Sequence, residues 1–80
     1  MSSVRLYSWN VFSRRAAGVT DSPARAAGHV AVELAEAPAG AVGSVRRVTL
    51  SSAGHARYVD LGEVARATRE DDGGVHWEVV

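Results

Sequence analysis

Histidine and carboxylate side chains have the greatest chemical potential in this chain, and their spacing decides what they can do. The three histidines, His29, His55 and His76, lie far apart in the sequence. A zinc site needs three or four His, Cys or carboxylate ligands in one place, and the chain has no cysteine. His29 and Glu33 lie one helical turn apart and supply at most half of a site. The sequence therefore predicts neither a metal site nor a cofactor.

Motifs for nucleophilic or acid–base catalysis are missing from the sequence as well. No serine lies in a nucleophile elbow, and no Ser-His-Asp order stands out. Asp71-Asp72 is an adjacent carboxylate pair, but it falls in a predicted turn, where acids stay solvated and lack the pocket that acid–base catalysis requires. The chain has no glycine-rich phosphate loop. We therefore expect a protein that is not an enzyme.

Arginines suggest one binding function, since all nine basic residues are arginine. Adjacent strand residues point to opposite faces, so Arg46 and Arg47 in mid-strand direct one guanidinium toward the helix side or a rim of the sheet. A sheet that displays arginines and aromatic rings can bind nucleic acid, although the net charge of zero lacks the usual basic excess. Nucleic-acid binding is therefore the alternative function, and its candidate residues are Arg5, Arg14, Arg15, Arg46 and Arg47.

Large apolar side chains suggest the other binding function. Five aromatic rings accompany one predicted helix, which can cover only part of one sheet face. An apolar patch left uncovered on a small domain marks a surface for a partner protein. Leu6 and Phe12 lie opposite the expected core face of Tyr7, Trp9 and Val11, so they are the candidate protein-interaction residues.

The junction Thr20-Asp21-Ser22-Pro23 places a helix in the chain. It combines an N-cap residue with a proline suited to the first helical turn. The helix is predicted from about Pro23 to Ala37, and Gly28 within it suggests close packing of helix on sheet. Its apolar stripe is expected to comprise Ala27, Val30, Ala31 and Leu34.

Strands are predicted on both sides of this helix. Residues 4–13 form the first strand, with Val19-Thr20 pairing briefly before the helix, and residues 44–51 form the second. A turn at Ser52-Ala53-Gly54 follows, and residues 63–70 fit either helix or strand. The Asp71–Gly74 turn and the alternating Val75-His76-Trp77-Glu78-Val79 favour a long hairpin. The expected fold is a single α+β domain over residues 1–80, in the order β-α-β-β-β, with one helix on a mainly antiparallel sheet.

The size of the chain bears on its partners and its location. An 80-residue domain without cysteine has a small core and no disulfide to support it, so a homodimer or a protein partner is a natural source of further stability. No targeting segment and no apolar run long enough for a bilayer is visible, so a cytoplasmic protein without membrane contact is expected.

Two resemblances accompany these patterns. Residues 18–27, a polar cap followed by an alanine-containing helix, look like the strand-to-helix junction of HicB-type antitoxins. In that family the helix packs on a small antiparallel sheet, and the partner is a small ribonuclease toxin; the present sequence shows no clear two-stranded hairpin before its helix. The chain as a whole resembles short proteins of GC-rich actinobacteria, through Trp9-Asn10-Val11 and Ser44-Val45-Arg46-Arg47, which implies no activity. The sequence thus predicts a cytoplasmic, non-catalytic regulatory domain that binds another protein or a second copy of itself through a sheet edge or face.

Overall fold

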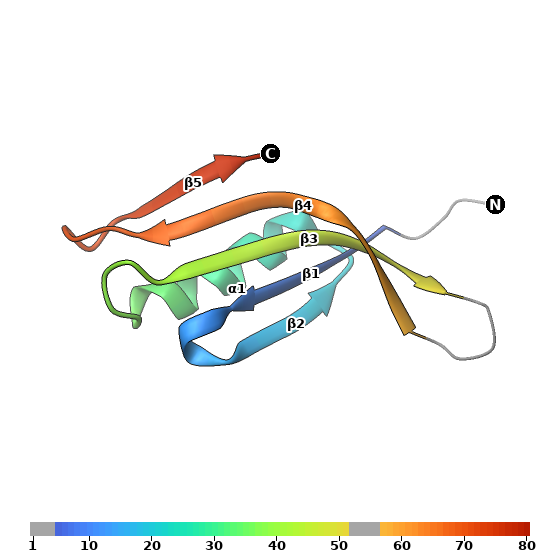
Figure 1. Cartoon of the computed structure of the whole chain (residues 1–80), viewed down its shortest axis with the longest axis horizontal. Helices are drawn as coiled ribbons and strands as arrows, with labels where there is room; N and C mark the ends of the chain where they lie inside the picture. The colour runs from blue at the N-terminus through green and yellow to red at the C-terminus, as the bar shows by residue number, and fades with distance from the viewer. Residues whose placement is uncertain (1–4, 52–56) are drawn as a thin grey trace.

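Hairpins and one helix make up the fold, which a computed structural model describes for residues 5–51 and 57–80. A five-stranded antiparallel sheet, in the order β2-β1-β3-β4-β5, carries the helix α1 on one face (Figure 1). The elements are β1 (Leu6–Val11), the 3-10 turn η1 (Phe12–Arg14), β2 (Ala16–Thr20), α1 (Pro23–Ala35), β3 (Val42–Ser51), β4 (Arg57–Arg69) and β5 (Val75–Val79). The predicted α+β class, with one helix on an antiparallel sheet, is confirmed. The predicted start of the first strand at residue 4, the turn at Ser52-Ala53-Gly54 and His55 lie outside the described residues.

One strand was missed by the sequence analysis. Val19-Thr20, which were expected only to pair briefly, belong to the full strand β2, so the chain has one strand more before the helix than the predicted order β-α-β-β-β. The first strand ends at Val11 because η1 and the left-handed Arg15 (φ 53°) reverse the chain directly after it. Gly18 faces Trp9 across this hairpin, and a Cβ on Gly18 would lie 2.7 Å from Nε1 of the indole ring. Gly18, which has little strand preference of its own, therefore makes room for the indole ring of Trp9.

The helix begins as predicted. Ser22 is the N-cap residue, its Oγ accepts a hydrogen bond from the backbone N–H of Arg25 at 3.2 Å, and Pro23 occupies the first turn. The helix ends at Ala35, two residues before the expected end. Its buried row is Ala26, Val30 and Leu34, at a spacing of four, so the predicted stripe through Ala27 and Ala31 was displaced toward one side. A row at this spacing is one of the ridges by which helices pack.

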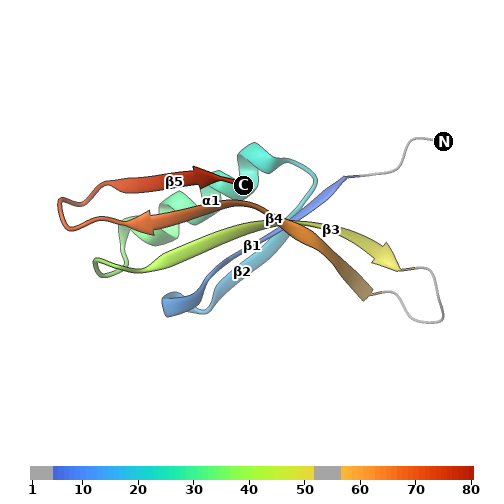
Figure 2. The ribbon, with the colours of Figure 1, turned by 45° about the horizontal axis from the view of Figure 1, so that its top comes forward.

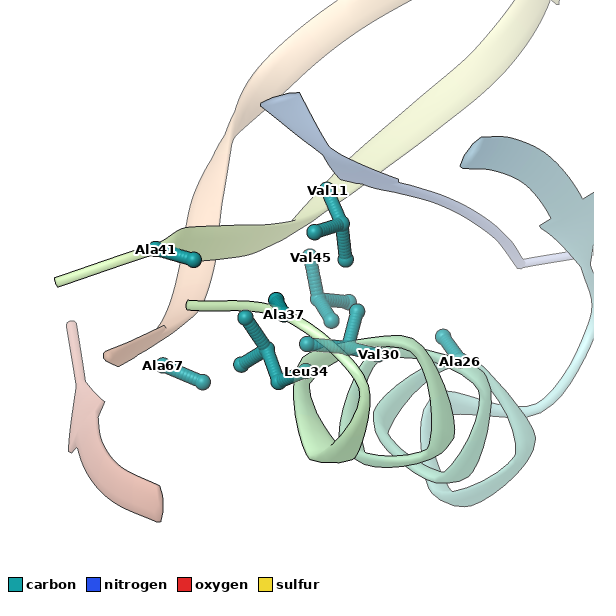
Figure 3. Close-up of a cluster of buried hydrophobic side chains, with 8 residues drawn as sticks. All are labelled: Val11, Ala26, Val30, Leu34, Ala37, Ala41, Val45 and Ala67. Carbon is teal, nitrogen blue, oxygen red and sulfur yellow. The ribbon is translucent and has the colours of Figure 1, made fainter. Parts of the chain in front are cut away.

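The core lies between this row and the covered face of the sheet (Figure 3). Tyr7, Trp9 and Val11 face the helix as predicted, with Val11 fully buried. The helix α1 approaches strand β3 closely at Gly43, because a Cβ there would lie 2.5 Å from Cγ1 of Val30. The eight buried members of the cluster are Val11, Ala26, Val30, Leu34, Ala37, Ala41, Val45 and Ala67.

The segment 63–70, whose sequence fits either helix or strand, is strand as far as Arg69. β4 runs without interruption through residues 63–69, so the long hairpin is confirmed, and the Asp71–Gly74 turn closes it. In that turn Asp72 Oδ1 accepts a hydrogen bond from the N–H of Gly74 at 2.8 Å. The predicted role of Gly28 was wrong: it lies on the exposed side of α1, where a Cβ would meet no atom within 4 Å.

Candidate functional site

One face of the sheet carries no helix from the described part of the chain, and we call it the open face (Figure 2). Strand alternation and register place Asn10, Ser44, Arg66 and Glu78 in one row across β1, β3, β4 and β5 on this face. Ser44 is 2% exposed although no helix covers it. The open face is therefore polar at its centre.

Two bulges in β4 gather charged residues on the open face. Leu61 and Val64 have no partner in β3, so the pairing shifts by one residue at each of them. Residues three apart in a regular strand point to opposite faces. The two shifts bring Asp60, Glu63 and Arg66 to the same face. Gly62, between the bulges, has φ 123°, a left-handed conformation that glycine adopts without strain.

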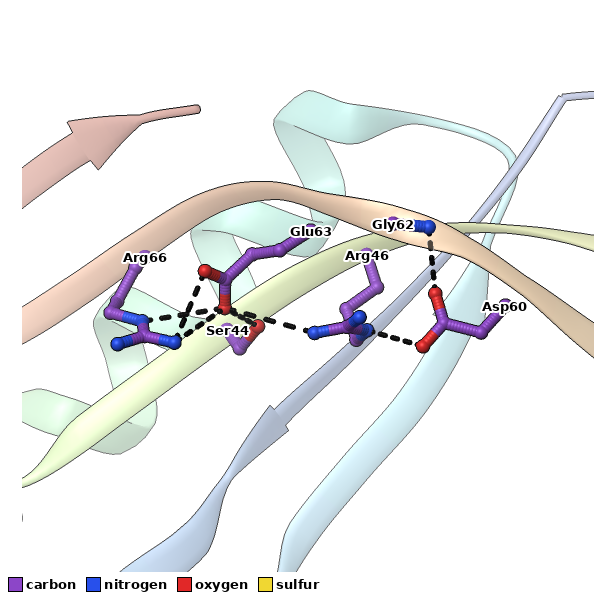
Figure 4. A network of polar contacts seen from close by, with 6 residues as sticks. All are labelled: Ser44, Arg46, Asp60, Gly62, Glu63 and Arg66. Atoms are coloured by element: carbon purple, nitrogen blue, oxygen red, sulfur yellow. Dashed lines mark hydrogen bonds and ion pairs between the residues drawn. The ribbon is translucent and has the colours of Figure 1, made fainter.

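A polar network links these residues to β3 (Figure 4). The Ser44 hydroxyl donates to Glu63 Oε2 at 2.6 Å, and Arg66 Nη2 lies 3.2 Å from Glu63 Oε1. Arg46 Nε donates to Asp60 Oδ2 at 2.6 Å, while its Nη1 lies 4.0 Å from Glu63 Oε2. Two carboxylates and two guanidiniums are thus balanced within one cluster.

Both carboxylates of this network are held in the ionised form. The hydrogen bond from Ser44, aided by Arg66, lowers the pKa of Glu63. The backbone N–H of Gly62, at 2.8 Å, and the guanidinium of Arg46 lower the pKa of Asp60. A general acid needs a raised pKa, so the arrangement suits structural ion pairing between β3 and β4. Close to it, Oδ1 of Asn10 is buried and accepts no hydrogen bond from the described residues.

Apolar side chains gather where β3 and β4 extend past the rest of the sheet. Pairing of β1 with β3 stops at Leu6–Val48, and pairing of β5 with β4 stops at Val79–Ala65. Beyond these points β3 and β4 form a two-stranded ribbon (Figures 1 and 2). We define the ribbon surface as the three exposed apolar residues of the ribbon and one of the adjoining bulge: Leu50, Tyr58, Val59 and, at the bulge, Leu61. Leu50 and Tyr58 are a cross-strand pair, and each is 53% exposed.

The two residues predicted to bind a protein do not lie together. Leu6 is half-buried on the open face, opposite Val48 and so next to the ribbon. Phe12 is 65% exposed, but it lies in η1 at the other end of β1, about 20 Å away at about 3.3 Å per residue. Only Leu6 adjoins the ribbon surface. The prediction missed Leu50 and Tyr58, and the available signal was that these two large apolar residues lie on the two sides of the predicted turn.

The predicted nucleic-acid arginines are also dispersed. Arg14 lies 2.7 Å from Glu33 and 3.2 Å from Glu36 of α1, and the hydrogen bond to Glu33 raises the pKa of its guanidinium. Arg46 is held by Asp60 on the open face, and Arg47 points to the opposite face. Arg5, Arg15 and Arg47 are exposed. The structure therefore does not bring the five arginines to one surface.

Histidines likewise form no ligand set in the described residues, which contain no group of three or more metal-binding side chains. The ring of His29 stacks on Trp9 with centroids 4.9 Å apart and 10° between the planes. Glu33, its predicted companion, binds Arg14 instead. His76 Nε2 lies 3.7 Å from Glu78 Oε1 on the open face of β5.

The described residues contain neither a pocket nor a helix that could cross a membrane. No pocket opens on the molecule as described in residues 5–51 and 57–80. Within those ranges, α1 lacks the length and apolar character to cross a bilayer, and no other α-helix is present. No family model, curated protein or solved structure gives a significant match to this chain. The resemblance to HicB-type antitoxins therefore stays a prediction.

Proposed function

We propose that this chain is a non-catalytic, cytoplasmic regulatory domain that binds another protein through its ribbon surface. The observation that carries the proposal is the cross-strand pair Leu50–Tyr58, half-exposed on a ribbon that no other described element covers. Val59, on the other face of the ribbon, and Leu61, at the bulge beside it, add two further exposed apolar side chains.

The chemistry of the ribbon surface fits a protein partner. Exposed apolar residues grouped on a small domain mark an interaction site, and tyrosine is enriched among the residues that dominate binding energy. An extended segment of the partner can add backbone hydrogen bonds along a strand edge. The fitting partner therefore presents an apolar groove or an unpaired strand.

The polar network strengthens this assignment because it holds the base of the ribbon. Arg46 and Asp60 join β3 and β4 next to the exposed pair, at 2.6 Å. The two bulges of β4 flank Gly62 and Glu63 at the same place. A bulge raises local twist and redirects the strand, so the ribbon is held in a fixed direction before a partner arrives.

Affinity capture with matched variants tests the proposal. The tagged protein is incubated with its native lysate, with and without nuclease, and the retained proteins are identified by mass spectrometry. The double variant Leu50→Ser/Tyr58→Ser removes the apolar pair without touching the core. Val32→Ser is the control, because Val32 is an equally apolar residue, 66% exposed on the outer side of α1.

The outcomes separate the two binding functions. A stoichiometric protein that survives nuclease, is lost by the double variant and is kept by Val32→Ser supports the ribbon surface. Retention of that protein by the double variant refutes it. Recovery that collapses on nuclease treatment transfers the function to nucleic acid, with the exposed Arg5, Arg15 and Arg47 as the residues to test next.

A further inference from the structure

The outer edge of β5 is unpaired within the described residues, because β5 ends the strand order. Backbone groups alternate in direction along an antiparallel strand. Val80 donates its N–H to Val64 at 3.1 Å, and the Gly74 carbonyl accepts from Glu70 at 2.8 Å. Even-numbered residues therefore direct their backbone groups toward β4. The N–H and C=O groups of Val75, Trp77 and Val79 point to the free edge.

The sequence of β5 is complementary to itself when reversed. Read from either end, it places valine, a polar residue, tryptophan, a polar residue and valine, and the polar residues are His76 and Glu78. Antiparallel pairing of two copies about Trp77 sets each Val75 opposite Val79 and each His76 opposite Glu78. We propose that β5 pairs with β5 of a second copy of this chain, in this register, to form a homodimer.

Hydrogen bonding and side-chain contact both favour this register. The outward groups of residues 75, 77 and 79 meet the same groups of the second copy, so no edge donor or acceptor in this stretch is left unpaired. His76 and Glu78 fall at positions without mutual backbone hydrogen bonds, where opposed side chains come closest. The imidazole can donate to the opposing carboxylate, and Arg66 lies on the other side of Glu78 in the same row.

The arrangement also accounts for the most exposed apolar side chain of the described residues. Val79 is 86% exposed, on the face that carries α1. In the dimer it lies against Val75 and beside Trp77 of the second copy. A two-fold axis perpendicular to the sheet keeps both helices on one face of a continuous sheet. The net charge of zero leaves no overall repulsion between the copies.

The other edge of the sheet lacks this complementarity. β2 has the sequence Ala-Ala-Gly-Val-Thr, with no charged residue to define a register. Gly-rich strands without charge specify pairing weakly. β5 is therefore the edge with a defined partner. The proposal does not depend on the ribbon surface, which lies on other strands.

Sedimentation equilibrium of the whole chain tests dimerisation, from about 10 µM to about 1 mM, since small interfaces dissociate in this range. The wild type is expected to pass from monomer to dimer. Val79→Lys is expected to weaken association at least tenfold, because it buries an unpaired charge against valine. Val19→Lys, at an exposed valine of β2, is the matched control and is expected to leave association unchanged. Far-UV circular dichroism at low concentration verifies that both variants fold.

Substitution at His76 tests the register separately. His76→Glu is expected to weaken the dimer about three- to tenfold, since two like-charge pairs then oppose each other. His76→Lys, with a permanent positive charge, is expected to dimerise at least as tightly as the wild type. A wild type that stays monomeric at 1 mM, an unaffected Val79→Lys variant, or equal dimerisation of the two His76 variants would overturn the proposal. None of these results bears on the Leu50–Tyr58 capture experiment, so the two proposals fail independently.

Discussion

Replacing Gly28 with alanine should stabilise the protein. Gly28 lies inside α1, has ordinary helical backbone geometry and is exposed. A Cβ added there meets no atom within 4 Å, so the substitution costs nothing in packing. It removes only the conformational freedom that glycine gives to the unfolded chain and to a helix interior.

The expected gain in stability of the Gly28→Ala variant follows from the helix propensities of the two residues. Glycine is about 0.8–1 kcal/mol less favourable than alanine inside a helix. For a domain of this size, 1 kcal/mol corresponds to a shift in melting temperature of about 4–8 °C. Thermal and urea unfolding, followed by far-UV circular dichroism at fixed protein concentration, measure both quantities.

Gly43→Ala is the matched control, with the opposite sign. Its Cβ would lie 2.5 Å from Cγ1 of Val30 and 3.3 Å from the carbonyl oxygen of Asn10. Overpacking of this kind costs about 1–3 kcal/mol. A Gly28→Ala variant that melts at or below the wild-type temperature would refute the exposed placement of Gly28. A Gly43→Ala variant of unchanged stability would refute the close approach of α1 to β3.

Three further predictions concern the core, the helix cap and the polar network. Leu34→Ala should lower the free energy of unfolding by about 2–5 kcal/mol, measured by urea titration, because Leu34 is fully buried. Ser22→Ala should cost about 1 kcal/mol in the same assay, whereas Ser22→Asp should keep most of the cap. The lowered pKa values of Glu63 and Asp60 stabilise the fold above the ordinary carboxyl pKa of about 4, and this contribution is lost as pH falls through the folded-state pKa values. Urea midpoints between pH 3 and pH 7 should show a smaller loss in Ser44→Ala, and an unchanged pH profile would contradict the Ser44–Glu63 bond.

Local chemistry made the helix start and the last hairpin predictable. Ser22 and Pro23 act within their own turn, and the Asp71–Gly74 turn uses residues whose backbone preferences are intrinsic. The alternation of β5 likewise predicted its two faces. β2 could not be found in this way, because Ala16, Ala17 and Gly18 have little strand preference of their own. Gly18 serves the Trp9 ring on the neighbouring strand, a requirement set by tertiary contact.

The polar network and the ribbon surface could not be predicted either, because they depend on the register and the ends of strands. Counting a regular hairpin back from the Leu50–Tyr58 pair sets Arg46 opposite Gly62, whereas the bulge at Leu61 moves its partner to Glu63. No residue type in β4 predicts this register shift, since a glycine such as Gly62 is equally typical of a turn. The candidate residues Leu6 and Phe12 were chosen from strand alternation alone, and the alternation ends at Val11, because η1 begins at Phe12.

The strand order has a consequence for how the chain folds. Every strand pairing except one joins neighbours in sequence, and the exception is β1 with β3, which flank β2 and α1. Hairpins close short segments and form within microseconds, but β1 and β3 meet only after the intervening segment has been ordered. Most of the loop-closure entropy of the molecule is therefore concentrated in one event. The packing of α1 on Val11 and Gly43, which bridges those two strands, is the contact that compensates for it. We therefore expect the N-terminal β-hairpin with its helix and the C-terminal three-stranded meander to form as local folding units, and the pairing of β1 with β3 to limit the folding rate.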